Sequence, residues 1–228
     1  MVRIGIIDSG CSAAELGNAV AFDEEGKIVE AVADQVGHGT VVAEIIRRSC
    51  PNAELIYAQV MFDKPVTSAL RIAAALDWFA NPEATPKADI LCMSFGVAAD
   101  RDVLRHAVFR AAGAGIVQIA SVPASRLSDS KCYPGDYQMV IAATGDARCA
   151  WDEVSELNQS VFGVWSNSPE RGGCGAAGAS IAAARLTGLV AAQFYECGRL
   201  LPHQKIIYRL LSMASYRGAE RRTRRRAL

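Results

Sequence analysis

The alternation of short apolar runs with stretches of helical periodicity is the feature that most constrains this fold. Apolar runs of strand length predict β-strands in five places: Val2–Asp8, Glu54–Met61, Asp89–Phe95, Gly115–Ala120 and Gln138–Ala143. Apolar residues at three- and four-residue spacing predict helices: His38–Ser49, Thr67–Phe79, Asp100–Ala112, Ser180–Cys197 and Pro202–Ala214. Because alternating strands and helices form a parallel sheet covered on both faces, the sequence predicts an α/β fold with three layers, α/β/α, around a mainly parallel central sheet.

Length and charge narrow the class of protein. A chain of 228 residues fits one domain, and 51% apolar residues exclude a disordered chain. We assign residues 1–215 to that domain and residues 216–228 to a basic, flexible C-terminal tail. The 24 basic and 24 acidic residues cancel, so we expect no nucleic-acid partner and no membrane partner. The apolar stretch Ser180–Cys197 contains Arg185 and Glu196, which favours a buried helix over a membrane span.

The cysteines and the N-terminus indicate a cellular compartment. The chain has seven cysteines and no CxxC motif: Cys11, Cys50, Cys92, Cys132, Cys149, Cys174 and Cys197. An odd number at wide spacing argues against a complete disulfide framework. The N-terminal sequence MVRIGIIDSG lacks the apolar core and cleavage site of a signal peptide. These features predict a cytoplasmic protein.

Three polar residues stand where α/β proteins gather their functional groups. Asp8 ends the first predicted strand, whereas His38 and Ser180 begin predicted helices. Taken singly, such residues are commonly a turn aspartate, a capping histidine and a helix N-cap serine. Taken together, a carboxylate can orient an imidazole that removes a proton from a serine hydroxyl. The chain order Asp, His, Ser is also the order of one of the known catalytic-triad families.

The motifs around these residues resemble those of the subtilisin-like serine proteases. IGIIDSG is similar to the aspartate motif of that family, GHGTVVAEI to its histidine motif and GASIAAARLTG to its serine motif. ILCMSFG and YPGDYQMVIAATG are similar to two further segments, so the resemblance covers about residues 2–198. Ala179 and Ala184 replace a threonine and a proline that carry no proton chemistry. The resemblance implies a subtilisin-like catalytic domain. Secreted members of the family carry a propeptide, whereas this sequence begins at its first predicted strand, so we expect a compact intracellular member.

The resemblance also implies roles for individual residues. Ser180 is expected to be the nucleophile, His38 the general base and Asp8 the group that orients His38. The segment Ser94, Phe95 and Gly96 is expected to be an edge strand that binds an extended substrate. In the family, an asparagine side chain donates to the oxyanion. The aligned residue here is Ala124, which has no side-chain donor. We expect the neighbouring hydroxyl of Ser125 to replace it, the alternatives being an ordered water or a donor supplied when substrate closes the site.

The functional expectation is therefore a serine endopeptidase that forms an acyl-enzyme on Ser180. We expect a peptide or protein substrate, such as one dedicated peptide precursor. We expect no cofactor and no metal, since no Asp-rich loop suggests a calcium site. The missing asparagine leaves open a second interpretation, a catalytically impaired homologue that binds extended peptides. A nucleotide-binding α/β protein is a weaker alternative, because DSGCSAAELG after the first strand lacks GxGxxG.

Overall fold

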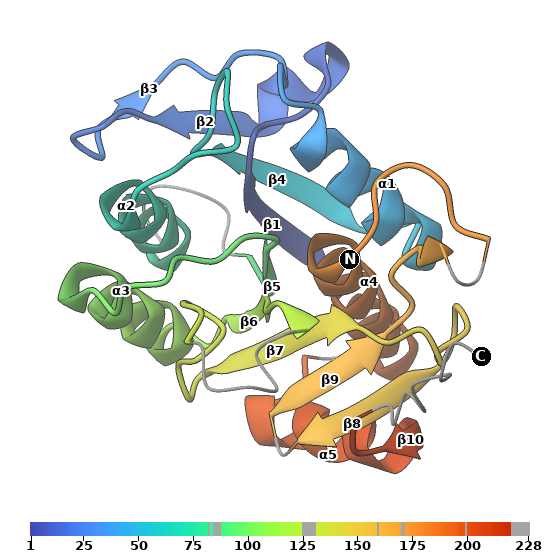
Figure 1. Ribbon diagram of the computed structural model, residues 1–228. Helices are drawn as coiled ribbons and strands as arrows, with labels where there is room; N and C mark the ends of the chain where they lie inside the picture. Colours follow the sequence, from blue (N-terminus) through green and yellow to red (C-terminus); the bar gives the residue numbers. More distant parts are fainter. Residues whose placement is uncertain are drawn as a thin grey trace.

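The computed structural model describes residues 1–81, 83, 88–124, 131–158, 160–169, 172–198 and 200–219 (Figure 1). The strands within these residues are β1 (Arg3–Asp8), β2 (Ala19–Phe22), β3 (Ile28–Val29), β4 (Glu54–Gln59), β5 (Ile90–Met93), β6 (Val117–Ser121), β7 (Val140–Gly145), β8 (Val154–Asn158), β9 (Val161–Val164) and β10 (Ala214–Arg217). They form one sheet in the order β10-β8-β9-β7-β6-β5-β1-β4-β2-β3. The predicted α/β fold is confirmed.

The central strands of the sheet all run in the same direction. β1 pairs in parallel with β4 on one side and with β5 on the other. β5, β6, β7 and β9 continue the parallel pairing. Only the pairs β2–β3 and β8–β9 of the described sheet are antiparallel. The carboxyl ends of the central strands therefore meet at one edge, where α/β proteins place their functional groups.

Helices cover both faces of the sheet. One face carries α1 (His38–Ser49), α4 (Ala179–Cys197) and α5 (His203–Met213), and the other carries α2 (Ala69–Ala80) and α3 (Asp102–Gly113) (Figure 1). Successive strand residues point to opposite faces, so Ile4 and Ile6 of β1 join the core under α1 and α4. Ile7 joins the core under α2 and α3. This arrangement gives the predicted three layers.

All ten predicted helices and strands are present; α1 has the predicted bounds, and the other nine differ from the prediction at one or both ends. The 3₁₀ helix η1 (Ala13–Asn18) and the strands β2, β3, β8, β9 and β10 were not predicted. β3 has two residues and both are exposed, so it carries no hydrophobic pattern. β10 begins directly after α5 and extends to Arg217, two residues into the segment that the sequence assigned to the tail. Residues 220–228 lie outside the described part of the chain.

The apolar helix α4 crosses the core of the protein. Its buried residues lie on all sides, from Ile181 to Phe194. It packs against β5, β6 and β7 of the sheet and against its neighbour on the same face, α1. Within the described residues, none of the helices combines the length and the apolar character needed to cross a membrane.

Candidate active site

Three elements bring the candidate residues to the carboxyl edge of the sheet. Asp8 is the last residue of β1, which lies between β4 and β5 in the middle of the sheet. His38 is the first residue of α1, and Ser180 is the second residue of α4. His38 bonds to Asp8 at the end of β1, and Ser180 bonds to a residue just after the end of β5, so the N-termini of α1 and α4 lie at the same edge of the sheet.

Asp8 and His38 form a direct hydrogen-bonded pair. The Nδ1 atom of His38 lies 2.7 Å from Oδ1 of Asp8, and the same oxygen accepts the backbone N–H of Ser9 at 2.8 Å. Asp8 is 1% exposed, whereas the His38 side chain is 30% exposed. The hydrogen bond that His38 donates to Asp8 raises the pKa of His38. Burial opposes this shift, and the negative charges of Asp8 and Asp34 add to it. Nδ1 is occupied by Asp8, so Nε2 is the ring nitrogen left to exchange a proton.

Asp34 is a site residue that the sequence analysis missed. Its Oδ1 accepts the backbone N–H of Gly37 at 2.8 Å, and its Oδ2 accepts the backbone N–H and the hydroxyl of Thr40 at 2.9 Å each. Burial alone would raise the pKa of this carboxyl, but the bonds from Thr40, Ser9 and Gly37 outweigh it and lower the pKa. Asp34 therefore caps the helix that begins with His38. The signal in the sequence was an aspartate three residues before the glycine of GHGT.

A glycine makes the approach of α1 to β1 possible. A Cβ atom on Gly39 would overlap the backbone oxygen of Gly10. The Gly39 N–H donates to the Ser9 hydroxyl at 2.9 Å. The residue after His38 thus contacts the turn after Asp8, which fixes the spacing of the Asp8–His38 pair.

The Ser180 hydroxyl does not bond to His38 in this structure. It donates to the backbone oxygen of Ser94 at 2.7 Å, and the Ser94 hydroxyl donates to the backbone oxygen of Ser180 at 3.2 Å. These two bonds connect the start of α4 to the end of β5. The first bond within α4 runs from the Ala182 N–H to the Gly178 oxygen, so the Ser180 N–H has no partner inside the helix.

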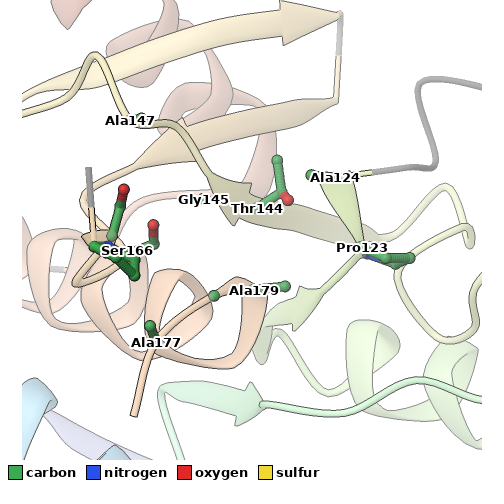
Figure 2. A pocket seen from close by; sticks show the side chains of 11 residues that line it. Pro123, Ala124, Thr144, Gly145, Ala147, Ser166, Ala177 and Ala179 are labelled. Atoms are coloured by element: carbon green, nitrogen blue, oxygen red, sulfur yellow. The ribbon is translucent and has the colours of Figure 1, made fainter. Parts of the chain in front are cut away.

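A pocket of about 500 Å³ opens beside the start of α4 (Figure 2). Small side chains line most of it, together with two serines, one threonine and two prolines: Pro123, Ala124, Thr144, Gly145, Ala147, Ser166, Ser168, Pro169, Ala177, Gly178 and Ala179. Ala124 is thus in the vicinity of the Ser180 backbone, and it has no donor to offer. Ser125, the predicted replacement, lies outside the described residues.

The segment predicted to bind the substrate backbone has a different secondary structure from the one expected. Ser94, Phe95 and Gly96 were predicted to form an edge strand, but β5 ends at Met93 and these three residues belong to no strand. The physical reason is that Ser94 turns its hydroxyl and its carbonyl to Ser180 rather than to a neighbouring strand. Beyond them, Val97 and Tyr133 exchange two backbone hydrogen bonds as an antiparallel bridge.

The segment lies directly over Cys132. A Cβ atom on Gly96 would overlap the Cys132 Sγ atom, so Gly96 leaves space for this thiol. Within the described part of the chain, no group of three His, Cys, Asp or Glu side chains is placed to hold a metal ion. The polar side chains of Asp34 and Ser94 lie next to those of Asp8, His38 and Ser180 through the hydrogen bonds described above.

Comparisons with known proteins show the family and the fold of the chain. The chain matches the sequence profile of the subtilase family over residues 1–218. Its fold resembles a structure described as the S41 psychrophilic protease, with a TM-score of 0.65, 18% identity, and coverage of 92% of this chain and 82% of that one.

A lanthipeptide protease has a similar fold, with a TM-score of 0.67, 15% identity, and coverage of 91% of this chain and 78% of that one. No curated protein sequence matches the chain. At these identities the two structures support the fold, and the profile, which spans nearly the whole chain, decides the family. The chain belongs to the subtilase family of serine proteases.

Proposed function

We propose that this protein is a serine endopeptidase whose nucleophile is Ser180. The observation that carries the proposal is the 2.7 Å bond between His38 Nδ1 and the buried Asp8 carboxylate. This bond fixes the tautomer of the ring and stabilises its protonated form. It leaves Nε2 to accept the proton of a serine at the start of the neighbouring helix, α4.

The chemistry follows from these roles. Ser180 rotates from the Ser94 carbonyl to His38 as substrate enters, loses its proton to Nε2 and attacks the scissile carbonyl carbon. The Ser180 N–H then donates to the oxygen on which negative charge develops. Protonated His38 returns the proton to the leaving amine, which breaks the peptide bond and leaves an acyl-enzyme. Water, deprotonated by His38, hydrolyses the acyl group and restores the Ser180 hydroxyl.

Labelling with a fluorophosphonate tests this assignment. The wild-type protein should label at one site, and Ser180→Ala should abolish both labelling and peptide cleavage. Loss of such a nucleophile costs on the order of 10⁶ in turnover. His38→Ala should lower turnover by a similar factor. The double variant with Ser180→Ala should be little worse than either single variant, because the two groups act as a unit. A Ser180→Ala protein that keeps more than about a hundredth of wild-type turnover would show that the nucleophile is another residue.

A second candidate function is binding of extended peptides without cleavage. Two observations favour it: the Ser180 hydroxyl donates to Ser94 rather than to His38, and Ala124 supplies no oxyanion donor. The same labelling experiment separates the two candidates. A folded protein that binds peptides but neither labels at Ser180 nor cleaves them would support the binding function.

We propose that the substrate backbone lies along Ser94, Phe95 and Gly96. Support comes from their place next to Ser180 and from the absence of a strand paired with this segment among the residues that the structure describes. Gly96→Ala should raise KM by about 10-fold or more with a smaller effect on kcat, because the new methyl group displaces the segment through Cys132.

Two further variants check the cause of the Gly96 effect. Adding Cys132→Ala should restore KM, because the Cys132 Cβ atom would lie 3.8 Å from the new methyl group, an ordinary contact. Gly113→Ala is the matched control, since a Cβ atom there meets nothing within 4 Å. If Gly96→Ala left KM unchanged, the substrate would have to bind elsewhere.

We also propose a narrow substrate range, the maturation of one dedicated peptide precursor in the cytoplasm. The compact catalytic domain and the widely spaced cysteines support this. The similar fold of a lanthipeptide protease is compatible with it. Cleavage of a randomised peptide library would test the proposal: a narrow enzyme cuts few members, whereas cleavage at many unrelated sequences would contradict it.

A further inference from the structure

A glutamine ends the apolar strand β4, directly beside Asp8. Gln59 pairs with Asp8 in the register of the sheet and is 0% exposed. Side chains alternate along a strand, and Leu55 and Tyr57 of β4 belong to the core under α1 and α4. Gln59 therefore points to the same face of the sheet as these two residues. Burying a polar side chain costs free energy unless its atoms are hydrogen-bonded, so packing alone does not explain a glutamine here.

The two polar atoms of the Gln59 amide bond to two separate loops. Its Nε2 atom donates to the Ser9 backbone oxygen at 2.9 Å, and its Oε1 atom accepts the Val32 backbone N–H at 2.9 Å. Gly10 leaves room for this contact, because a Cβ atom on it would lie 2.9 Å from Gln59 Nε2. The glutamine thus joins the turn after β1 to the loop that leads from β3 to α1.

The turn after β1 contacts both sides of the Asp8–His38 pair. The Ser9 N–H donates at 2.8 Å to Oδ1 of Asp8, the same oxygen that bonds to His38. The Ser9 hydroxyl accepts the N–H of Gly39, the residue after His38, at 2.9 Å. A shift of the Ser9 backbone would therefore move the Asp8 carboxylate relative to the start of α1.

The loop from β3 to α1 reaches His38 by a second route. Two residues after Val32, the Asp34 carboxylate accepts the backbone N–H groups of Gly37 and Thr40 at the start of α1. A shift of the Val32 backbone would therefore move Asp34 and, with it, the first turn of the helix that carries His38. Gln59 is bonded to both routes, although the two loops are far apart in the sequence.

We propose that Gln59 is a positioning residue that holds the Asp8 carboxylate and the His38 ring at bonding distance. Both bonds of its side chain go to backbone atoms, so it acts through the two loops rather than on the reacting groups. The carboxylates whose charges raise the pKa of His38, those of Asp8 and Asp34, adjoin these same loops. The inference rests on the proposed function, because cleavage depends on this geometry only if His38 is the base.

The first test replaces Gln59 by methionine, which has a similar length and no amide, and uses a peptide that the wild-type protein cleaves. The Ser9 oxygen and the Val32 N–H lose their partner, so the two loops are free to shift. We expect kcat to fall by about 10-fold or more, because small displacements of a catalytic group are costly. KM should change little, since Ser94, Phe95 and Gly96 follow β5, on the other side of β1 from β4. Rates are expressed per site titrated with a fluorophosphonate, so that misfolded protein does not count.

The pKa of His38 separates positioning from a purely structural role. A variant that only loses stability keeps the hydrogen bond between His38 and Asp8, which is the largest cause of the raised pKa. If Gln59 positions the pair, Gln59→Met weakens this bond and lowers the pKa of His38, so the midpoint of kcat/KM moves to lower pH. NMR titration of the histidine ring protons in a Ser180→Ala background measures the same pKa without cleavage. The other two histidines of the chain serve as internal references.

Gln118→Met is the matched control. Gln118 of β6 is also 0% exposed, and its Nε2 atom donates at 3.0 Å to the Val108 oxygen of α3, on the opposite face of the sheet. This variant should keep its kcat and the pKa of His38. If Gln59→Met does not fold, Gln59→Asn takes its place. The asparagine amide stands on a shorter side chain that cannot reach both loops, so the same losses are expected.

Loss of kcat together with a lowered pKa of His38 in the Gln59 variant, and neither in Gln118→Met, supports the inference. A folded Gln59→Met protein that keeps more than about a third of its kcat, or that keeps the pKa of His38, overturns it. Equal losses in Gln118→Met overturn it as well. These results leave the proposed function intact. A wild-type protein that neither labels at Ser180 nor cleaves peptides refutes the proposed function instead, and the two failures are distinguishable because the NMR titration needs no cleavage.

Discussion

At the scale of single residues, the two nitrogens of His38 have different surroundings. Nδ1 is held by a buried carboxylate, so the carboxylate fixes the orientation of the ring. The ring itself remains partly open to solvent. The second oxygen of the Asp8 carboxylate, Oδ2, is buried and has no hydrogen-bond partner among the described residues. The Asp8 carboxylate therefore favours a positive charge on His38 through a single bonded oxygen.

The raised pKa of His38 predicts the pH dependence of cleavage. Only neutral His38 can accept the Ser180 proton, so kcat/KM should rise with pH, with a midpoint above about 6.5, the ordinary value for histidine. The contribution of the Asp8–His38 pair to the stability of the fold changes with pH in the opposite direction to kcat/KM. The Asp8–His38 pair stabilises the fold fully below the unfolded-state pKa of His38, and this contribution is lost as pH rises through the folded-state pKa. Steady-state kinetics from pH 5 to 9 would measure the midpoint.

Asp8→Asn is the control for the pH profile. It removes the hydrogen bond to a charged carboxylate, which is the largest cause of the raised pKa, so the midpoint should move to lower pH. A profile that stays flat between pH 5 and 8, with chemistry shown to be rate-limiting, would contradict a histidine base.

At the scale of one element, the N-terminus of α1 depends on a side chain from the preceding loop. Gly37, the residue before the helix, has positive φ and supplies no side-chain cap. Asp34 takes this role through its bonds to Gly37 and Thr40. A carboxylate at a helix N-terminus also interacts favourably with the helix dipole. The geometry of His38 thus depends on Asp34.

Asp34→Ala should lower both stability and activity. The loss of an N-cap costs about 0.5–2 kcal/mol in the free energy of unfolding, measured with urea. Because the pKa of Asp34 is lowered, its contribution is present above its unfolded-state pKa and is lost as pH falls through the folded-state pKa. We expect kcat to fall by about 10-fold or more, because small shifts in a catalytic group are costly.

Asp23→Ala is the matched control for Asp34. Its carboxylate accepts the backbone N–H groups of Glu25 and Lys27 in the turn between β2 and β3, away from His38. Asp23→Ala should lose some stability and keep its kcat. If both variants lost kcat to the same degree, the effect of Asp34 on His38 would not be specific.

At the scale of the whole molecule, one buried cation connects distant parts of the chain. Arg185 in α4 is 3% exposed and donates to the Trp151 backbone oxygen at 2.7 Å and to the Ser49 hydroxyl at 2.9 Å. Its guanidinium also lies 4.4 Å from the centre of the Trp151 ring. Burial lowers the pKa of the Arg185 guanidinium, and the negative charge of Asp152 opposes this shift. The contacts join α4 to the end of α1 and to the turn before β8.

Arg185→Ala should destabilise the whole domain by on the order of 3 kcal/mol, because a large buried side chain is removed. Arg185→Met should recover part of this loss, since the methionine side chain fills much of the same volume and leaves a smaller cavity than alanine. Arg48→Ala is the control: Arg48 is exposed and lies 3.8 Å from the centre of the same Trp151 ring, so its loss should cost only about 0.5–1 kcal/mol. Equal losses in Arg185→Ala and Arg48→Ala would contradict this account, with urea unfolding as the measurement.

The sequence by itself determined the central strands, the main helices and the positions of Asp8, His38 and Ser180. These features are local: hydrophobic periodicity identifies an element from its own residues, and a polar residue at the end of an apolar run marks the functional edge of the sheet. The strands β8, β9 and β10 escaped prediction because each has only four or five residues. β9 is buried throughout, whereas β8 and β10 include exposed polar residues, which weakens their apolar pattern.

Only the tertiary structure decided how the polar groups of the site are paired. Ser94 and Ser180 are 86 residues apart, and their mutual hydrogen bonds follow from the packing of α4 against the end of β5. The two bonds of the Gln59 side chain, and the contact that Cys132 imposes on Gly96, depend equally on segments distant in sequence. The physical reason is that periodicity reports which face of an element is buried, whereas the partner of a buried polar atom is set by long-range packing.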